Sequence, residues 1–276
     1  MTWNRRKGAW QRRTCCLRPV DLRHDLSFAH AYVEGLIPWR IMKILAISDV
    51  VADLVQSPLI AQRFKDVDLV LSCGDLPFEY LEYVVTMLCK PLFYVSGNHV
   101  QHDVASADGV VKNKPEGCVD IHRRVVHYRG LLIAGIEGSM RYSDGDHQYT
   151  DGQMSTLAAT MVPRFWWNTW RYGRALDILV THAPPFGIHD GQDLCHQGFR
   201  AFLDLMDRYR PRYLIHGHVH LYRLDAERVT RYGQTTVLNA YGHQVVEIDE
   251  HQLGRAQSIG RLPPGEVRDH DLSGLP

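Results

Sequence analysis

Met42-Lys43-Ile44-Leu45-Ala46-Ile47-Ser48-Asp49 is a short apolar run that ends in a carboxylate. An apolar run of roughly four to eight residues is typical of a strand that is buried on both faces. Comparable runs recur along the chain, and amphipathic stretches separate them. This alternation is typical of α/β folds, in which helices cover a largely parallel sheet. We therefore expect an α/β domain that begins at Met42.

The remaining elements are predicted from the same patterns. We expect strands over residues 43–48, 67–73, 92–96, 124–128, 131–136, 177–181 and 212–216, and further β-rich pieces over 219–224, 228–231, 235–239 and 244–248. The amphipathic stretches predict helices over residues 57–65, 78–89, 153–172 and 198–209. No internal repeat divides this pattern, so a single domain over residues 42–254 is expected.

The two ends of the chain depart from the alternating pattern. Residues 1–41 are basic and show no sustained apolar period. We expect a flexible extension there, and a basic targeting arm is the alternative. Residues 255–276 contain Pro263-Pro264-Gly265, which predicts an irregular tail.

The totals exclude some classes of protein. Lys plus Arg (31) equals Asp plus Glu (31) among the 276 residues, so the net charge does not indicate a nucleic-acid partner. No apolar run reaches the roughly 18 residues of a spanning helix, so a soluble protein without a membrane partner is expected. The six cysteines form no CxxC pair, which favours unpaired thiols and a cytoplasmic location over a disulfide framework.

Polar residues come directly after five of the expected strands. Residues 44–48 precede Asp49, 68–73 precede Gly74-Asp75, 92–96 precede Gly97-Asn98-His99, 178–181 precede His182, and 213–215 precede His216-Gly217-His218-Val219-His220. Ligands of open α/β sheets collect at the carboxyl ends of strands. The five clusters therefore predict one shared site.

The residue types in these clusters suit a metal ion. Carboxylate and amide oxygens combined with imidazole nitrogens favour Mn, Fe, Zn or Ni over softer ions. Gly74, Gly97 and Gly217 permit sharp turns and close backbone approach just before the polar side chains. We therefore expect one or two divalent metal ions.

In this order, Gly-Asp, Gly-Asn-His, a lone His and Gly-His-x-His resemble the calcineurin-like metallophosphoesterase superfamily. Each fragment alone is weak, but the ordered set covers residues from about Met42 to about Ile248. The resemblance implies a two-sheet β-sandwich flanked by helices, a four-layer α-β-β-α arrangement. It also implies hydrolysis of a phosphomonoester or phosphodiester, such as a small organic phosphate or nucleotide, by attack of a metal-activated hydroxide.

The resemblance also assigns roles to individual residues. Asp75 would bridge two metals, and Asp49 and His220 would complete what we call the first metal site. Asn98, His182 and His218 would complete the second metal site with Asp75. His99 would stand beside the leaving oxygen, to stabilise or protonate it.

Two positions depart from the family pattern. The first motif is normally Asp-x-His, but Val51 stands where the histidine is expected. Val100 comes after His99 where the family usually has an aspartate that orients the histidine. Either the first metal site survives with waters or a substitute such as Asp53 or His102, or only the second fills, or the chain is a metal-binding scaffold without turnover. A nuclease is a further alternative within enzymes.

Three other features have a plain structural explanation beside a functional one. The loop that begins at Glu137 could line the pocket, with Arg141 on a phosphate, or be merely solvated. His189 and His196 come after His182 and could be pocket or surface residues. Phe165, Trp166, Trp167 and Trp170 could stack a nucleobase, but aromatic residues at helical spacing more often pack in a core.

Overall fold

The computed structural model describes residues 41–99, 113–223 and 226–249. The expected basic extension, apart from Ile41, and the expected irregular tail lie outside these residues. Val100 and His102 also lie outside them.

Two large sheets form the centre of the fold. The first has the strand order β13-β1-β2-β3-β4, formed by β1 (Ile41–Ser48), β2 (Leu69–Ser72), β3 (Leu92–Tyr94), β4 (Val119–Asp120) and β13 (Gly242–Asp249). The second has the order β11-β12-β10-β9-β6-β5, formed by β5 (Val125–Tyr128), β6 (Leu131–Ile136), β9 (Ile178–Thr181), β10 (Tyr213–His216), β11 (Val229–Tyr232) and β12 (Thr235–Asn239). The short strands β7 (Ser139–Met140) and β8 (Gln148–Tyr149) pair separately.

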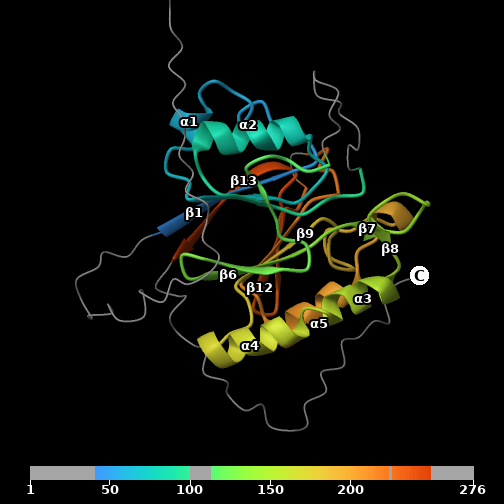
Figure 1. Ribbon diagram of the computed structural model, residues 1–276. Helices are drawn as coiled ribbons and strands as arrows, with labels where there is room; N and C mark the ends of the chain where they lie inside the picture. The colour runs from blue at the N-terminus through green and yellow to red at the C-terminus, as the bar shows by residue number, and fades with distance from the viewer. Residues whose placement is uncertain (1–40, 100–112, 224–225, 250–276) are drawn as a thin grey trace, which may run out of the picture.

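Helices cover the outer face of each sheet (Figure 1). The first sheet is covered by α1 (Ile60–Arg63) and α2 (Phe78–Leu88), and the second by α3 (Asp151–Ala159), α4 (Val162–Tyr172) and α5 (Arg200–Tyr209). A two-sheet sandwich between helical layers is thus present, which confirms the predicted four-layer fold class.

Three apolar clusters fill the spaces between the four layers. In β1, Ile44 and Ala46 face the second sheet, whereas Leu45 and Ile47 pack towards α1 and α2. Successive side chains of a strand point to opposite faces, so a strand covered on both sides is apolar throughout. The third cluster packs the second sheet against α3, α4 and α5. This double burial explains why the expected strands are uninterrupted apolar runs.

The strand directions bring the polar clusters together. β1, β2, β3 and β4 run parallel, as do β6, β9, β10 and β12. The sheets also meet directly near these strand ends, where the Cys73 thiol donates to the Ile215 carbonyl at 3.6 Å. Residues that come directly after β1, β2, β3, β9 and β10 therefore share one edge of the sandwich.

Three sequence expectations about the elements are wrong. The expected helix over 153–172 is two helices, α3 and α4, separated at Thr160-Met161. Pro163 stands in the first turn of α4, where it cannot donate to a preceding helical turn. Residues 219–223 form no strand, and the short strands β4, β7 and β8 were not expected.

The described part of the chain contains four cysteines. Cys73, Cys118 and Cys195 are free, but Cys89 is disulfide-bonded, so the expectation of unpaired thiols is wrong for Cys89. Among the helices in the described ranges, none has the length and apolar character that crossing a bilayer requires.

Candidate metal centre

The expected ligands occupy tight turns at the strand ends. Asp49, Asp75 and His218 have positive φ angles of 65°, 55° and 68°. Residues with side chains rarely adopt this left-handed conformation, which typically costs of order 1 kcal/mol or more and clusters at functional sites. The fold thus holds three of the six expected ligands in an unfavourable backbone conformation.

Two glycines leave the room that the site needs. A Cβ atom at Gly97 would lie 1.9 Å from Asp75 Oδ1, and one at Gly217 would lie 1.9 Å from Ser48 Oγ and 2.5 Å from Asp49 Oδ2. Any side chain would therefore displace a carboxylate of the site. The expected role of these glycines in close backbone approach agrees with the structure.

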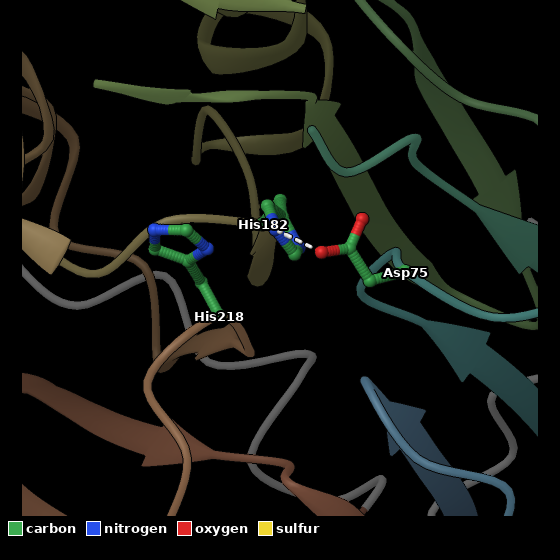
Figure 2. A group of neighbouring side chains, drawn as sticks. All are labelled: Asp75, His182 and His218. Carbon is green, nitrogen blue, oxygen red and sulfur yellow. Dashed lines mark ion pairs between the residues drawn. The ribbon is translucent and has the colours of Figure 1, made fainter. Parts of the chain in front are cut away.

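The residues of the second metal site lie together. Asp75, His182 and His218 offer ligand atoms that all lie within 4.8 Å of one another (Figure 2). The Asn98 Oδ1 atom is 3.0 Å from His182 Nε2. All four expected side chains of this site therefore converge on one volume.

Hydrogen bonds around His182 show that this volume requires a positive charge. His182 Nδ1 donates to the Cys73 carbonyl across the two sheets at 2.7 Å. Its Nε2 faces two oxygen acceptors, Asn98 Oδ1 and Asp75 Oδ2, the latter at 3.3 Å. The Asn98 Nδ2 atom donates to the Tyr142 hydroxyl at 3.1 Å, which orients the amide oxygen towards His182.

Either a proton on Nε2 or a cation beside it must balance these converging lone pairs. Without a metal, burial lowers the pKa of His182, but Asp75 outweighs burial and raises it to about 9. Burial raises the pKa of Asp75, but His182 outweighs it and holds the pKa below its usual range. Divalent ions prefer this donor set of carboxylate, amide oxygen and imidazole nitrogen, so the residues fit a metal.

His218 is prepared as a neutral ligand. Its Nε2 donates to the Cys195 carbonyl at 2.7 Å, which leaves Nδ1 without a hydrogen. Burial lowers the pKa of His218 to about 3. A backbone carbonyl that fixes a histidine tautomer is a usual feature of metal sites.

The first metal site is less complete. The Asp49 carboxylate accepts the backbone N–H of His218 at 2.9 and 3.0 Å and lies 3.9 Å from His220 Nε2. Burial raises the pKa of Asp49. His220 Nδ1 is 3.0 Å from the Tyr222 hydroxyl. In the described chain, two groups of three potential ligands have their ligand atoms within 4.8 Å of one another: Asp75, His182 and His218, and Asp193, Cys195 and His196. Asp49 and His220 belong to neither group, and Val51 supplies no ligand.

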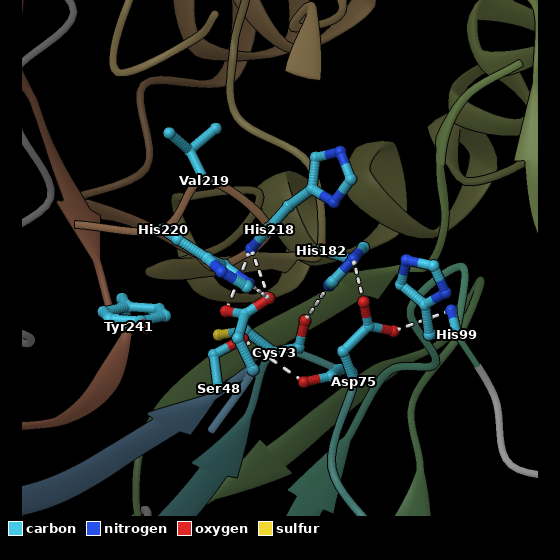
Figure 3. A network of polar contacts seen from close by, with 12 residues as sticks. Ser48, Cys73, Asp75, His99, His182, His218, Val219, His220 and Tyr241 are labelled. Carbon is cyan, nitrogen blue, oxygen red and sulfur yellow. Dashed lines mark hydrogen bonds and ion pairs between the residues drawn. The ribbon is translucent and has the colours of Figure 1, made fainter. Parts of the chain in front are cut away.

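His99 lies beside the second metal site (Figure 3). Its backbone N–H donates to Asp75 Oδ1 at 2.9 Å, so the same residue that carries the imidazole also orients the carboxylate. The structure thus places His99 next to Asp75, and its expected action on the leaving oxygen stays a prediction.

Sequence reasoning missed two contributors to the site. The Tyr142 hydroxyl, in the loop after β7, holds Asn98, and the Cys195 carbonyl holds His218. Tyr142 belongs to a loop without a motif, and a backbone carbonyl has no signature in the side-chain sequence. His196 lies beside His218, with ring centroids 5.3 Å apart. The two ring nitrogens of His189 are instead hydrogen-bonded to His216 and Thr230.

Glu137 anchors the loop that carries Tyr142. It accepts from the Tyr149 hydroxyl at 2.9 Å and pairs with His147 Nδ1 at 2.8 Å. Arg141 is exposed, and its guanidinium donates to the Gln148 carbonyl at 3.3 Å. The expected contact of Arg141 with a phosphate stays a prediction.

We expect Glu137→Gln to destabilise the protein in a pH-dependent manner. The hydrogen bond to Glu137 raises the pKa of His147 above 6.5, so this stabilisation is complete below 6.5 and is lost as pH rises through the folded value. Burial raises the pKa of Glu137, but His147 lowers it below 4.5, so stabilisation is lost as pH falls through that folded value. The full loss of stability in Glu137→Gln is therefore expected between pH 4.5 and pH 6.5.

The measurement is urea unfolding of wild type and variant at two pH values. The loss should be about 2 kcal/mol near pH 5.5, as for a charge-assisted hydrogen bond, and smaller near pH 8.5. An equal loss at both pH values would contradict an ionised His147–Glu137 pair.

The architecture and site together define a class: a two-sheet α/β sandwich with a carboxylate, amide and imidazole set at its strand ends. The family model for calcineurin-like phosphoesterase matches residues 42–222. The chain belongs to this family. No curated protein matches the sequence.

Solved structures are similar to this chain at low sequence identity. One matches with a TM-score of 0.51 and 14% identity, over 77% of this chain and 96% of that chain. TT1561 of Thermus thermophilus matches with a TM-score of 0.48 and 15% identity, over 76% of this chain and 99% of that chain. Vps29 of Entamoeba histolytica complexed with Zn²⁺ matches with a TM-score of 0.33 and 14% identity, over 73% of this chain and 74% of that chain.

Proposed function

We propose that this protein is a metal-dependent phosphoesterase that hydrolyses a small phosphomonoester or phosphodiester. The observation that carries the proposal is the convergence of Asp75, Asn98 and His182 on one volume, where the Asp75 carboxylate and the Asn98 amide oxygen both face the His182 imidazole. Carboxylate, amide and imidazole ligand atoms that meet at the strand ends of this family's fold suit a divalent ion. The substrate is a phosphate ester because the family acts on this class.

The second metal site, formed by Asp75, Asn98, His182 and His218, would hold the ion. A bound divalent ion would polarise the phosphoryl oxygens and lower the pKa of a nearby water. The chain itself supplies the orientation: Tyr142 directs the amide oxygen of Asn98, and the Cys195 carbonyl directs Nδ1 of His218. These bonds pre-organise the ligands before the substrate arrives.

His99 would protonate or stabilise the leaving oxygen. Its imidazole is exposed beside Asp75, and its backbone is tied to that carboxylate at 2.9 Å. An imidazole can donate a proton or a hydrogen bond, which suits either role.

The first experiment measures metal content together with ester hydrolysis. The purified protein is assayed by elemental analysis and with p-nitrophenyl phosphate and bis-p-nitrophenyl phosphate, with and without added Mn²⁺. We expect metal-dependent release from at least one ester, and the preferred ester distinguishes a monoesterase from a diesterase. Bound metal without release from either ester, or from a wider set of phosphate esters, would favour the scaffold alternative.

We further propose that a single ion fills the second metal site in the wild-type protein. Val51 removes one ligand from the first metal site, and Asp49 already accepts the His218 N–H. Val51→His should therefore raise the bound metal from one ion towards two per chain and tighten binding by about 10- to 100-fold.

Isothermal titration with Mn²⁺ and elemental analysis test this stoichiometry, and Val51→Leu is the matched control without a ligand atom. Two ions in the wild type would show that waters or another residue replace the missing imidazole. No gain in the histidine variant would show that the loop after β1 does not direct residue 51 towards the site.

A further inference from the structure

The helix α4 exposes an aromatic stripe that its packing does not explain. Trp166, Trp167 and Trp170 are 77%, 59% and 71% exposed, whereas Phe165 is completely buried. At 3.6 residues per turn, the three tryptophans fall within an arc of about 100°. The expectation of core packing therefore holds for Phe165 and is wrong for the tryptophans. Large apolar side chains gathered on a surface usually mark an interaction site.

The surroundings of this stripe are basic. The segments 121–136 and 152–176 contain no Asp or Glu. Tertiary structure joins them: Arg164 Nη1 donates to the Arg123 carbonyl at 2.6 Å, and the rings of His127 and Tyr172 stack at 5.4 Å. The edge strand β5 and the helix α4 thus form one surface, which we call the β5–α4 face.

Exposed arginines surround the tryptophans on the β5–α4 face. They are Arg123, Arg124, Arg129, Arg164 and Arg171. Of these, Arg129 pairs with Asp68, whereas none of the ion pairs within the described ranges includes the other four. The neighbouring α5 adds Asp204 and Asp207 together with Arg200 and Arg208, which balance in charge. The face therefore carries an excess of positive charge.

We propose that the β5–α4 face docks on an anionic lipid bilayer. Tryptophan combines an apolar ring with a polar N–H and is favoured at the boundary between headgroups and acyl chains. An aromatic stripe bordered by arginines on one helix is the composition of an interfacial helix, and each arginine adds attraction to anionic headgroups. The proposal concerns adsorption to the surface and requires no spanning helix.

Charge and geometry separate this occupant from two others. A second copy of the chain would bring like-charged arginines together, which disfavours self-association through this face. Single-stranded nucleic acid is bound in grooves between stacking aromatics. Here the rings of Trp167 and Trp170 already contact each other, with centroids 5.0 Å apart, and both are exposed on the helix α4.

The test is co-sedimentation of the full chain with vesicles of phosphatidylcholine alone and with about one third phosphatidylglycerol. We expect binding to the anionic vesicles, weakened by salt, and a blue shift of tryptophan fluorescence on binding. Arg164→Gln with Arg171→Gln should weaken binding about 30-fold, at about 1 kcal/mol per arginine. The matched control is Arg63→Gln on α1, in the opposite helical layer, which should bind as the wild type does.

A second set of variants tests the aromatic part. Trp166→Ser with Trp170→Ser should weaken vesicle binding at least about tenfold and leave the far-ultraviolet circular dichroism unchanged, because both side chains are exposed. Leu54→Ser, 48% exposed and distant from α4, is the control. The basic segment 1–41 is present in every variant, so differences between variants report on the β5–α4 face alone.

The outcomes are distinct. Vesicle binding that these substitutions weaken supports the proposal. Absence of binding, or binding that all variants share equally, overturns it. Loss of single-stranded RNA binding, or dissociation of a dimer, in the same variants without an effect on vesicles would also overturn it, in favour of that other occupant.

Discussion

Asp75→Asn should reduce phosphoesterase turnover about a thousandfold or more. The Asp75 carboxylate lies between the His182 imidazole and the His99 backbone: Oδ2 is 3.3 Å from His182 Nε2, and Oδ1 accepts the His99 N–H. Asparagine keeps the size but loses the charge and one acceptor oxygen. Loss of a metal's charge stabilisation removes several kcal/mol from the transition state, and about 1.4 kcal/mol corresponds to each tenfold change in rate.

The measurement is kcat with the better of the two nitrophenyl esters, together with metal content of the same sample. Asp66→Asn, an exposed carboxylate outside the site, is the control and should keep both values. A variant with an unchanged rate would remove Asp75 from the metal centre. A variant that keeps its metal but loses turnover would place Asp75 in positioning the ion rather than in holding it.

Gly97→Ala should weaken metal binding strongly, although it adds only one methyl group. Its Cβ would lie 1.9 Å from Asp75 Oδ1 and 2.8 Å from His182 Cε1, which is closer than a Cβ atom approaches other heavy atoms in a protein interior. Asp75 must therefore move, and the His99 N–H loses its acceptor. We expect metal affinity to fall at least about 100-fold, since even groups that only orient the ligands alter affinity by about 10- to 100-fold.

Isothermal titration with Mn²⁺ measures this loss, and thermal unfolding of the metal-free protein shows whether the fold survives. Gly152→Ala is the matched control, because a Cβ there meets nothing within 4 Å and alanine favours the helix α3 by up to about 1 kcal/mol. Undiminished affinity in Gly97→Ala would show that the strand end after β3 can move without disturbing Asp75.

The two basic regions of the chain illustrate what a sequence pattern can and cannot indicate. The absence of acids from 121–136 and from 152–176 is visible in the sequence. Their union in one face depends on contacts such as Arg164 with the Arg123 carbonyl, 41 positions apart. A balanced total charge concealed the local excess, because it averages over surfaces that never meet.

The aromatic residues of α4 show a second limit. Helical spacing predicts which side chains share a face, but it does not tell which face is covered. Phe165 is buried and the three tryptophans of the same helix are exposed, and only the position of the second sheet places Phe165 in the core. The break before Pro163 was accessible from the sequence, because proline cannot donate to the preceding turn.

The sequence by itself indicated an α/β layering and predicted that the polar residues after the apolar runs share one edge. Strands buried on both faces must be apolar throughout, and parallel strands place the residues at their carboxyl ends along one edge, so Asp75 and His182 could be assigned to one site from their positions after such runs. Only the tertiary structure decided how complete each metal site is. Hydrogen bonds from Asn98 to the Tyr142 hydroxyl and from His218 to the Cys195 carbonyl orient residues of the expected second site, while Asp49 accepts the His218 N–H. These contacts join residues far apart in the chain, and their geometry depends on how the two sheets meet rather than on any local pattern.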